Sequence, residues 1–147
     1  EEEVITRLSR VGYDNILGYL EGGFDAWKNA GKEIDSVRRI TADVFATELK
    51  QNNNKVIDVR KEGEFEGEHL EAAESLPLAY INDWIKDIDD SKHFYIHCAG
   101  GYRSMIAASI LNSRGIRNFS EIAGGYGAIA KTDLPKTDFV CPSTLKS

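Results

Sequence analysis

Short apolar segments alternate with helical patterns through most of the chain, and this alternation restricts the possible fold more than any other feature. Four apolar runs bounded by turn residues have the length of buried strands, at 55–60, 75–78, 93–97 and 119–122. Three segments with helical spacing of apolar residues lie before or between them, at 41–50, 79–88 and 104–113. Strands separated by helices of this length predict an α/β fold with a parallel sheet that helices cover on both faces.

The strand at 93–97 runs directly into a glycine-containing loop that begins with Cys98 and ends with Arg103. At the carboxyl end of a parallel strand, such a loop opens into the crevice where α/β proteins bind ligands. Gly100 and Gly101 permit a loop that turns its N–H groups inward, and the positive end of the following helix points to the same place. These features and the guanidinium of Arg103 favour a thiolate, so we interpret Cys98 as a nucleophile rather than a small core residue.

Composition excludes several classes of function. The 147 residues carry a net charge of −6 without a block of Lys or Arg, which argues against nucleic-acid or anionic-membrane binding. Neither a membrane-spanning apolar run nor a secretory signal is present. Cys98 and Cys141 are too far apart in the sequence for a zinc-binding CxxC pattern, and they form no disulfide framework. We therefore expect a cytoplasmic protein without metal or cofactor.

A partial internal repeat suggests a second unit. Residues 8–24 resemble residues 111–126, with a one-residue insertion between Asn15 and Gly22. We interpret residues 1–39 as the remnant of an upstream sister domain, 40–135 as the main domain and 136–147 as a tail. The chain does not begin with Met, which fits a piece of a longer protein. The alternative is two unrelated strand–Gly-Gly–helix units.

Residues 98–104 (CAGGYRS), placed after an apolar strand, resemble the active-site loop of the rhodanese (sulfurtransferase) family. Spaced motifs in the same order at 56–60, 64–65, 69–70 and 76–78 resemble the first signature of that family, and 119–125 resembles its closing one. The resemblance covers about residues 38–130. It implies a rhodanese-like three-layer domain with a five-stranded parallel sheet flanked by helices, and it makes 1–39 the remnant of an upstream rhodanese-like repeat.

The resemblance also implies a chemistry. A sulfurtransferase of this family takes sulfane sulfur from a small donor, here thiosulfate or a low-molecular-weight persulfide, and holds it as a persulfide on Cys98 before a thiol acceptor removes it. Carried over to this sequence, the catalytic residues are Cys98 and Arg103. The substrate-binding loop residues are Ala99, Gly100, Gly101, Tyr102 and Ser104, and the residues of structural support are Asp58 and Arg60.

Two details of the loop separate the alternatives. The six residues from Cys98 to Arg103 suit sulfur, whereas related phosphatases have a loop one residue longer, which disfavours a Cys-dependent phosphatase. Many thiosulfate-using members carry Arg or Lys where Ala99 and Gly100 stand, which leaves room for a persulfide donor. A non-catalytic module for partner binding or redox sensing is the other alternative, and the presence of Cys98 argues against it.

Residues 97–104, together with the truncated repeat, are similar to rhodanese tails fused to metallo-β-lactamase-fold enzymes. This resemblance suggests a covalently linked domain of that fold as a partner in persulfide exchange.

Other polar residues near the motifs are interpreted as structural. Asp58 and Arg60 are expected to form an ion pair at a strand end, with Glu64 as a further partner of Arg60. By strand alternation, His97 should face the side of the sheet opposite to Cys98. Cys141 is interpreted as an incidental thiol, with a second sulfur relay site as the alternative.

Overall fold

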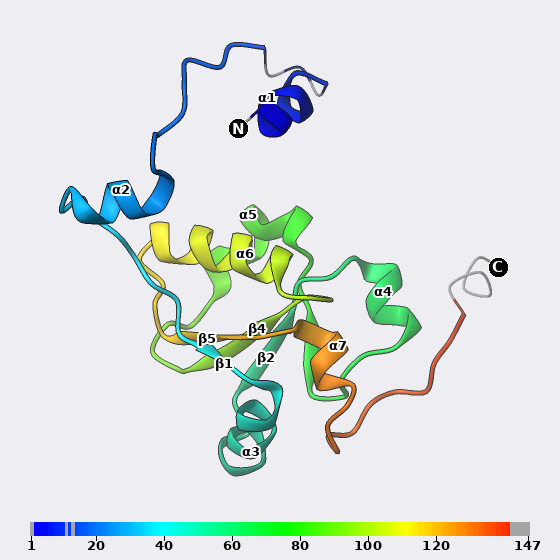
Figure 1. Cartoon of the computed structure of the whole chain (residues 1–147). Coiled ribbons are helices and arrows are strands. Elements are labelled where there is room, and N and C mark those ends of the chain that lie inside the picture. The colour runs from blue at the N-terminus through cyan, green and yellow to red at the C-terminus, as the bar shows by residue number, and fades with distance from the viewer. Residues whose placement is uncertain (1, 11, 13, 142–147) are drawn as a thin grey trace. The chain divides into compact units, whose positions relative to one another are not determined.

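A computed structural model describes residues 2–10, 12 and 14–141 of the chain (Figure 1). The chain divides into two compact units, residues 1–36 and 37–147. No helix within the described residues is long and apolar enough to cross a membrane.

The larger unit is built around one sheet of five strands in the order β1-β5-β4-β2-β3. The strands are β1 (Arg39–Ile40), β2 (Lys55–Asp58), β3 (Ala73–Ser75), β4 (Phe94–His97) and β5 (Phe119–Ile122). Every pairing between them is parallel. The predicted α/β fold with a five-stranded parallel sheet is therefore confirmed.

Helices cover both faces of this sheet. The α-helices of this unit are α3 (Ala42–Asn52), α4 (Glu62–Gly67), α5 (Ile81–Trp84), α6 (Tyr102–Ser113) and α7 (Gly125–Ile129). Two short 3₁₀ segments, η1 (Leu78–Tyr80) and η2 (Ile85–Asp87), flank α5. The predicted helix at 79–88 is confirmed as a run of helical segments over 78–87. Only its middle turn is α-helical, because i→i+3 hydrogen bonds tighten the backbone on either side of it.

The second predicted strand is displaced by two residues. We expected 75–78, whereas β3 occupies 73–75. Pro77 has no N–H to donate, so the regular ladder cannot continue through it. The amides of Leu76 and Leu78 on either side of it still bind carbonyls at the end of β2.

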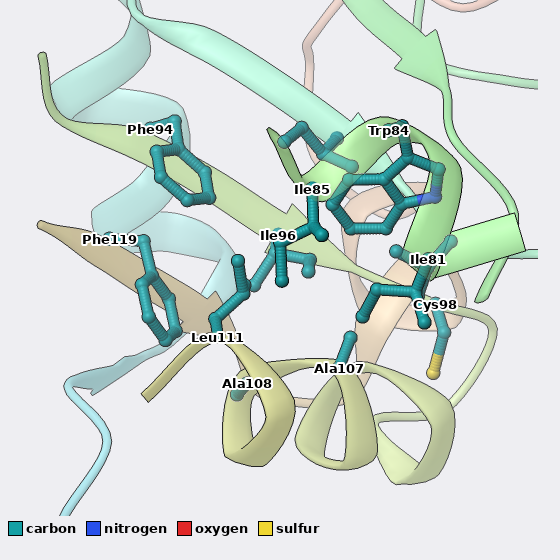
Figure 2. Packing of buried hydrophobic residues seen from close by; sticks show 12 residues of the cluster. Ile81, Trp84, Ile85, Phe94, Ile96, Cys98, Ala107, Ala108, Leu111 and Phe119 are labelled. Carbon is teal, nitrogen blue, oxygen red and sulfur yellow. The ribbon is translucent and has the colours of Figure 1, made fainter. Parts of the chain in front are cut away.

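Each face of the sheet has its own apolar core. One core packs α5 and α6 on the sheet and includes Ile57, Ile96 and Leu111, and Cys98 lies at its end beside Ala107 and Ile81 (Figure 2). The other packs α3 and α7 on the opposite face and includes Val56 and Tyr95. Consecutive residues of β2 and β4 thus serve opposite faces, as strand alternation requires.

The smaller unit contains α1 (Glu2–Ser9) and α2 (Gly23–Asn29), and its turns match those of the repeat partner. Gly12, after α1, has φ 89° where its counterpart Gly115, after α6, has φ 84°. Gly22 and Gly23 at the start of α2 have φ 76° and 57°, and Gly124 and Gly125 at the start of α7 have φ 79° and 54°. The sequence similarity therefore extends to the same left-handed turns at the same positions.

The two copies differ in what covers their apolar side chains. Leu111 of α6 is buried, whereas its counterpart Leu8 of α1 is 37% exposed. Ile129 of α7 is likewise buried, while its counterpart Trp27 of α2 is 43% exposed. None of the residues of α1 or α2 is buried.

We expect Leu111→Ala to lower the free energy of unfolding of the larger unit by about 2–5 kcal/mol, because it leaves a cavity against the sheet. Leu8→Ala is the matched control at the equivalent repeat position and should change that free energy by less than about 0.5 kcal/mol. Urea denaturation followed by tryptophan fluorescence measures both, and equal losses in the two variants would contradict this assignment of the core.

Candidate active site at Cys98

The cysteine loop leaves the carboxyl end of β4, the middle strand of the sheet. Helix α6 begins at Tyr102, two residues earlier than predicted, with Gly101 as its N-cap at φ 104°. Cys98 is 1% exposed, so its sulfur lies beneath the loop rather than on the surface. Figure 2 shows Cys98 next to α6 and at the edge of the apolar core.

The glycine turn before α7 holds the loop in shape. Tyr126 N donates to Cys98 O at 2.6 Å, and Gly127 N donates to Ala99 O at 3.0 Å. The contact is so close that a Cβ on Gly125 would lie 2.2 Å from Cys98 O. Because these two carbonyls are bound by α7, the amides that follow them in the loop are available to the sulfur.

The loop presents hydrogen-bond donors to the Cys98 sulfur. Gly101 N lies 3.1 Å from Cys98 Sγ, and Ser104 Oγ lies 3.4 Å from it. Burial raises the pKa of the Cys98 thiol, but hydrogen bonding from Ser104 and from the amides of Gly101 and Gly100 outweighs burial and lowers the pKa. The predicted preference for the thiolate therefore has a geometric basis.

Arg103 is engaged by a carboxylate. Its guanidinium donates to both oxygens of Glu64, at 2.6 and 2.8 Å, in a bidentate pair. The hydrogen bonds from Arg103 lower the pKa of Glu64 from 4.5 to about 2, which keeps the carboxylate ionised. Glu64 forms its ion pair with Arg103 rather than with Arg60, the partner predicted from the sequence. The charge of Arg60 contributes only at longer range, by helping to lower the pKa of Glu64.

Asp58 and Arg60 form a buried ion pair at the end of β2. Arg60 Nε donates to Asp58 Oδ2 at 2.7 Å, and Arg60 Nη2 donates to Glu68 O at 2.8 Å. The same guanidinium lies 4.1 Å from the ring centre of Tyr126, which follows the glycine turn. This pair thus packs against the segment that holds the cysteine loop.

His97 lies on the other face of the sheet, as strand alternation predicts. Its ring stacks with that of Tyr126, with 6.3 Å between the ring centres. Burial lowers the pKa of His97, although the nearby Asp58 carboxylate opposes this effect. A neutral imidazole supplies no positive charge to the neighbouring thiolate.

Sequence reasoning missed a buried carboxylate beside the site. Glu121 in β5 is fully buried, accepts from Ser104 Oγ at 2.7 Å and pairs with Arg39 Nε of β1 at 2.7 Å. A charged residue inside the apolar strand 119–122 was the available signal. Its partners come from other elements, so no local pattern identifies them.

The remaining loop residues line the outside. Tyr102 is 82% exposed and Gly100 is exposed, whereas Ala99 is partly buried.

An open groove of about 560 Å³ borders the Arg103–Glu64 pair and is lined by Arg60, Glu64, Tyr126 and Phe139, among others. Within the described residues, no cluster of three potential metal ligands occurs.

A model of the rhodanese-like domain matches residues 41–132, which is well over half of the chain. The chain belongs to the rhodanese-like family. A solved relative, a rhodanese-like domain protein of Staphylococcus aureus, is 27% identical with a TM-score of 0.61, covering 67% of this chain and 97% of that one.

Two curated relatives carry sulfur chemistry in their names. A putative sulfur carrier protein of Bacillus subtilis, YrkF, is 24% identical over 67% of this chain and 54% of the relative. A thiosulfate sulfurtransferase of Coxiella burnetii, GlpE, is 26% identical over 53% of this chain and 73% of the relative. The alignments span about half the length of the first curated relatives that match.

We expect Gly125→Ala to displace the cysteine loop, because its Cβ would collide with Cys98 O and its φ of 54° disfavours a side chain. The melting temperature should fall, and the Cys98 thiol should ionise at higher pH once the loop amides are displaced. Gly100→Ala is the matched control, because a Cβ there meets nothing within 4 Å. Unchanged ionisation of Cys98 in a folded Gly125→Ala variant would contradict the role of this turn.

Proposed function

We propose that this protein is a sulfurtransferase that carries sulfane sulfur as a persulfide on Cys98. The observation that carries the proposal is the buried Cys98 sulfur beneath a loop whose Gly101 amide reaches it at 3.1 Å. The donors that lower the pKa of the thiol can equally hold a negatively charged persulfide sulfur. Membership of the rhodanese-like family and the names of two distant relatives support the same chemistry.

The reaction proceeds in two displacements. The Cys98 thiolate attacks the outer sulfur of the donor, a new S–S bond forms at Sγ, and the bond to the outgoing group breaks with its electron pair. An acceptor thiolate then attacks the outer sulfur of the persulfide, and Cys98 leaves as a thiolate. Neither displacement needs a metal or an organic cofactor.

The charges around the loop favour a low-molecular-weight persulfide over thiosulfate as the donor. Ala99 and Gly100 carry no charge, and the guanidinium of Arg103 is shared with the carboxylate of Glu64. A doubly charged donor such as thiosulfate would find no uncommitted cation among the loop residues 98–103. The role of Arg103 is accordingly to fix the loop against α4 as well as to contribute charge.

The proposal extends to the organisation of the protein. We assign 1–39 to the C-terminal remnant of an upstream rhodanese-like repeat, 40–135 to the rhodanese-like domain and 136–147 to a tail. Matching glycine turns and the exposed counterparts of buried side chains support the repeat. We further propose that the protein works in a reducing cytoplasm. We also propose a covalently linked metallo-β-lactamase-fold domain that exchanges persulfide with Cys98.

Intact mass after incubation with glutathione persulfide tests the function. We expect a gain of one sulfur atom that Cys98→Ser abolishes and Cys141→Ser preserves. A parallel incubation with thiosulfate should load less of the protein at the same donor concentration. The loaded protein should return to its starting mass on addition of glutathione, because the acceptor thiol removes the sulfur.

Three outcomes would count against the proposal. No added sulfur from either donor would contradict it, and so would loading that persists in Cys98→Ser. Hydrolysis of a generic aryl phosphate that depends on Cys98 would favour a phosphatase instead.

A further inference from the structure

The hydroxyl of Ser104 has two acceptors and only one proton. Its Oγ lies 3.4 Å from Cys98 Sγ and 2.7 Å from Glu121 Oε1. All three residues are buried, so water does not reach the hydroxyl to resolve the competition. The hydroxyl can donate to the carboxylate or to the sulfur, but not to both at once.

Glu121 is held as a strong acceptor. Arg39 faces it directly across the β1–β5 pairing and donates from Nε to Oε2 at 2.7 Å. Glu121 is fully buried, so losing either Arg39 or Ser104 as a partner would leave part of its charge uncompensated and raise the free energy of the folded state. Both partners are therefore needed to stabilise the carboxylate. The shorter contact and the charge on the carboxylate favour donation from Ser104 to Glu121.

Gly101 allows this pair to lie against the cysteine loop. A Cβ at position 101 would lie 3.0 Å from Arg39 Nη2 and 3.4 Å from Glu121 Oε1. The same glycine donates its amide to Cys98 Sγ. Glu121 and Arg39 therefore lie directly against the residue that binds the sulfur.

The other charged groups around the site compensate one another. Arg103 is paired with Glu64, and Arg60 with Asp58. Burial lowers the pKa of His97 and keeps its ring neutral. Among these groups, Glu121 with Arg39 is the pair linked to Cys98 through a shared hydroxyl.

We propose that Glu121, paired with Arg39, is a positioning residue that accepts the hydrogen bond of the Ser104 hydroxyl and so withholds this donor from the Cys98 sulfur. The Ser104 oxygen then faces Cys98 with a lone pair. A thiol S–H can donate a hydrogen bond to this lone pair, whereas a thiolate has no proton to donate. A hydroxyl that donates to the sulfur adds to the loop amides in lowering the pKa of Cys98. Donation to Glu121 removes that contribution and leaves the loop amides to favour the thiolate. A resting cysteine with more thiol character is less prone to oxidation than a full thiolate.

This inference rests on the proposed function only in taking Cys98 as the working thiol, and it is tested without sulfur transfer. Ultraviolet absorbance of the thiolate is followed against pH in a Cys141→Ser background, with Cys98→Ser as the blank. We expect Glu121→Gln to lower the midpoint pH of Cys98 ionisation by about one unit, because it removes a buried negative charge and releases the hydroxyl. Ser104→Ala should move the midpoint little in the native chain but raise it by about one unit when added to Glu121→Gln.

An unchanged or higher midpoint in Glu121→Gln would overturn the proposal. A rise in Ser104→Ala as large in the native chain as in Glu121→Gln would also overturn it, because the hydroxyl would then donate to the sulfur throughout. Far-ultraviolet circular dichroism establishes that each variant is folded. If Glu121→Gln does not fold, Ser104→Ala in the native chain decides between the outcomes. A rise in the midpoint pH of Cys98 ionisation then contradicts the proposal, and an unchanged midpoint pH supports it. Sulfur loading measured on the same variants separates a failure here from a failure of the proposed function.

Discussion

The contact between the Gly124–Gly125 turn and the cysteine loop is the constraint on which the site depends. It fixes the carbonyls of Cys98 and Ala99 on α7, which leaves the following amides to face the sulfur. Without these hydrogen bonds, the loop would not be held in the conformation that directs its amides at the Cys98 sulfur. Tyr126, which follows the turn, packs against Arg60 of the Asp58–Arg60 pair. The ion pair at the end of β2 therefore supports the segment that holds the cysteine loop.

The charged groups around the loop form a set of matched pairs rather than a positive cluster. Glu64 neutralises Arg103, and Glu121 neutralises Arg39. Without these carboxylates, the two cations would attract anions to the site. The pKa of Cys98 is therefore lowered chiefly by hydrogen bonds, from the Ser104 side chain and from backbone amides of the loop. If Cys98 carries sulfur as we propose, these matched pairs favour a singly charged sulfur over a strongly anionic donor.

Much of the fold follows from local patterns in the sequence. The strand leading to Cys98, the helix after it and the closing strand 119–122 each carry an apolar run of the right length, and the structure places them there. The two-residue edge strand β1 was missed, because two residues carry no periodicity. The Glu64–Arg103 and Glu121–Ser104 contacts were also missed, since they join residues 39 and 17 positions apart and depend on how helices settle on the sheet.

A crystal structure of the chain after loading with glutathione persulfide tests the central claim most directly. We expect one extra sulfur bonded to Cys98 Sγ, pointing into the loop and within hydrogen-bonding distance of its amides. The Gly124–Gly125 turn should remain docked on the carbonyls of Cys98 and Ala99. An extra sulfur on Cys141, or one on Cys98 that points away from the loop amides, would contradict the account.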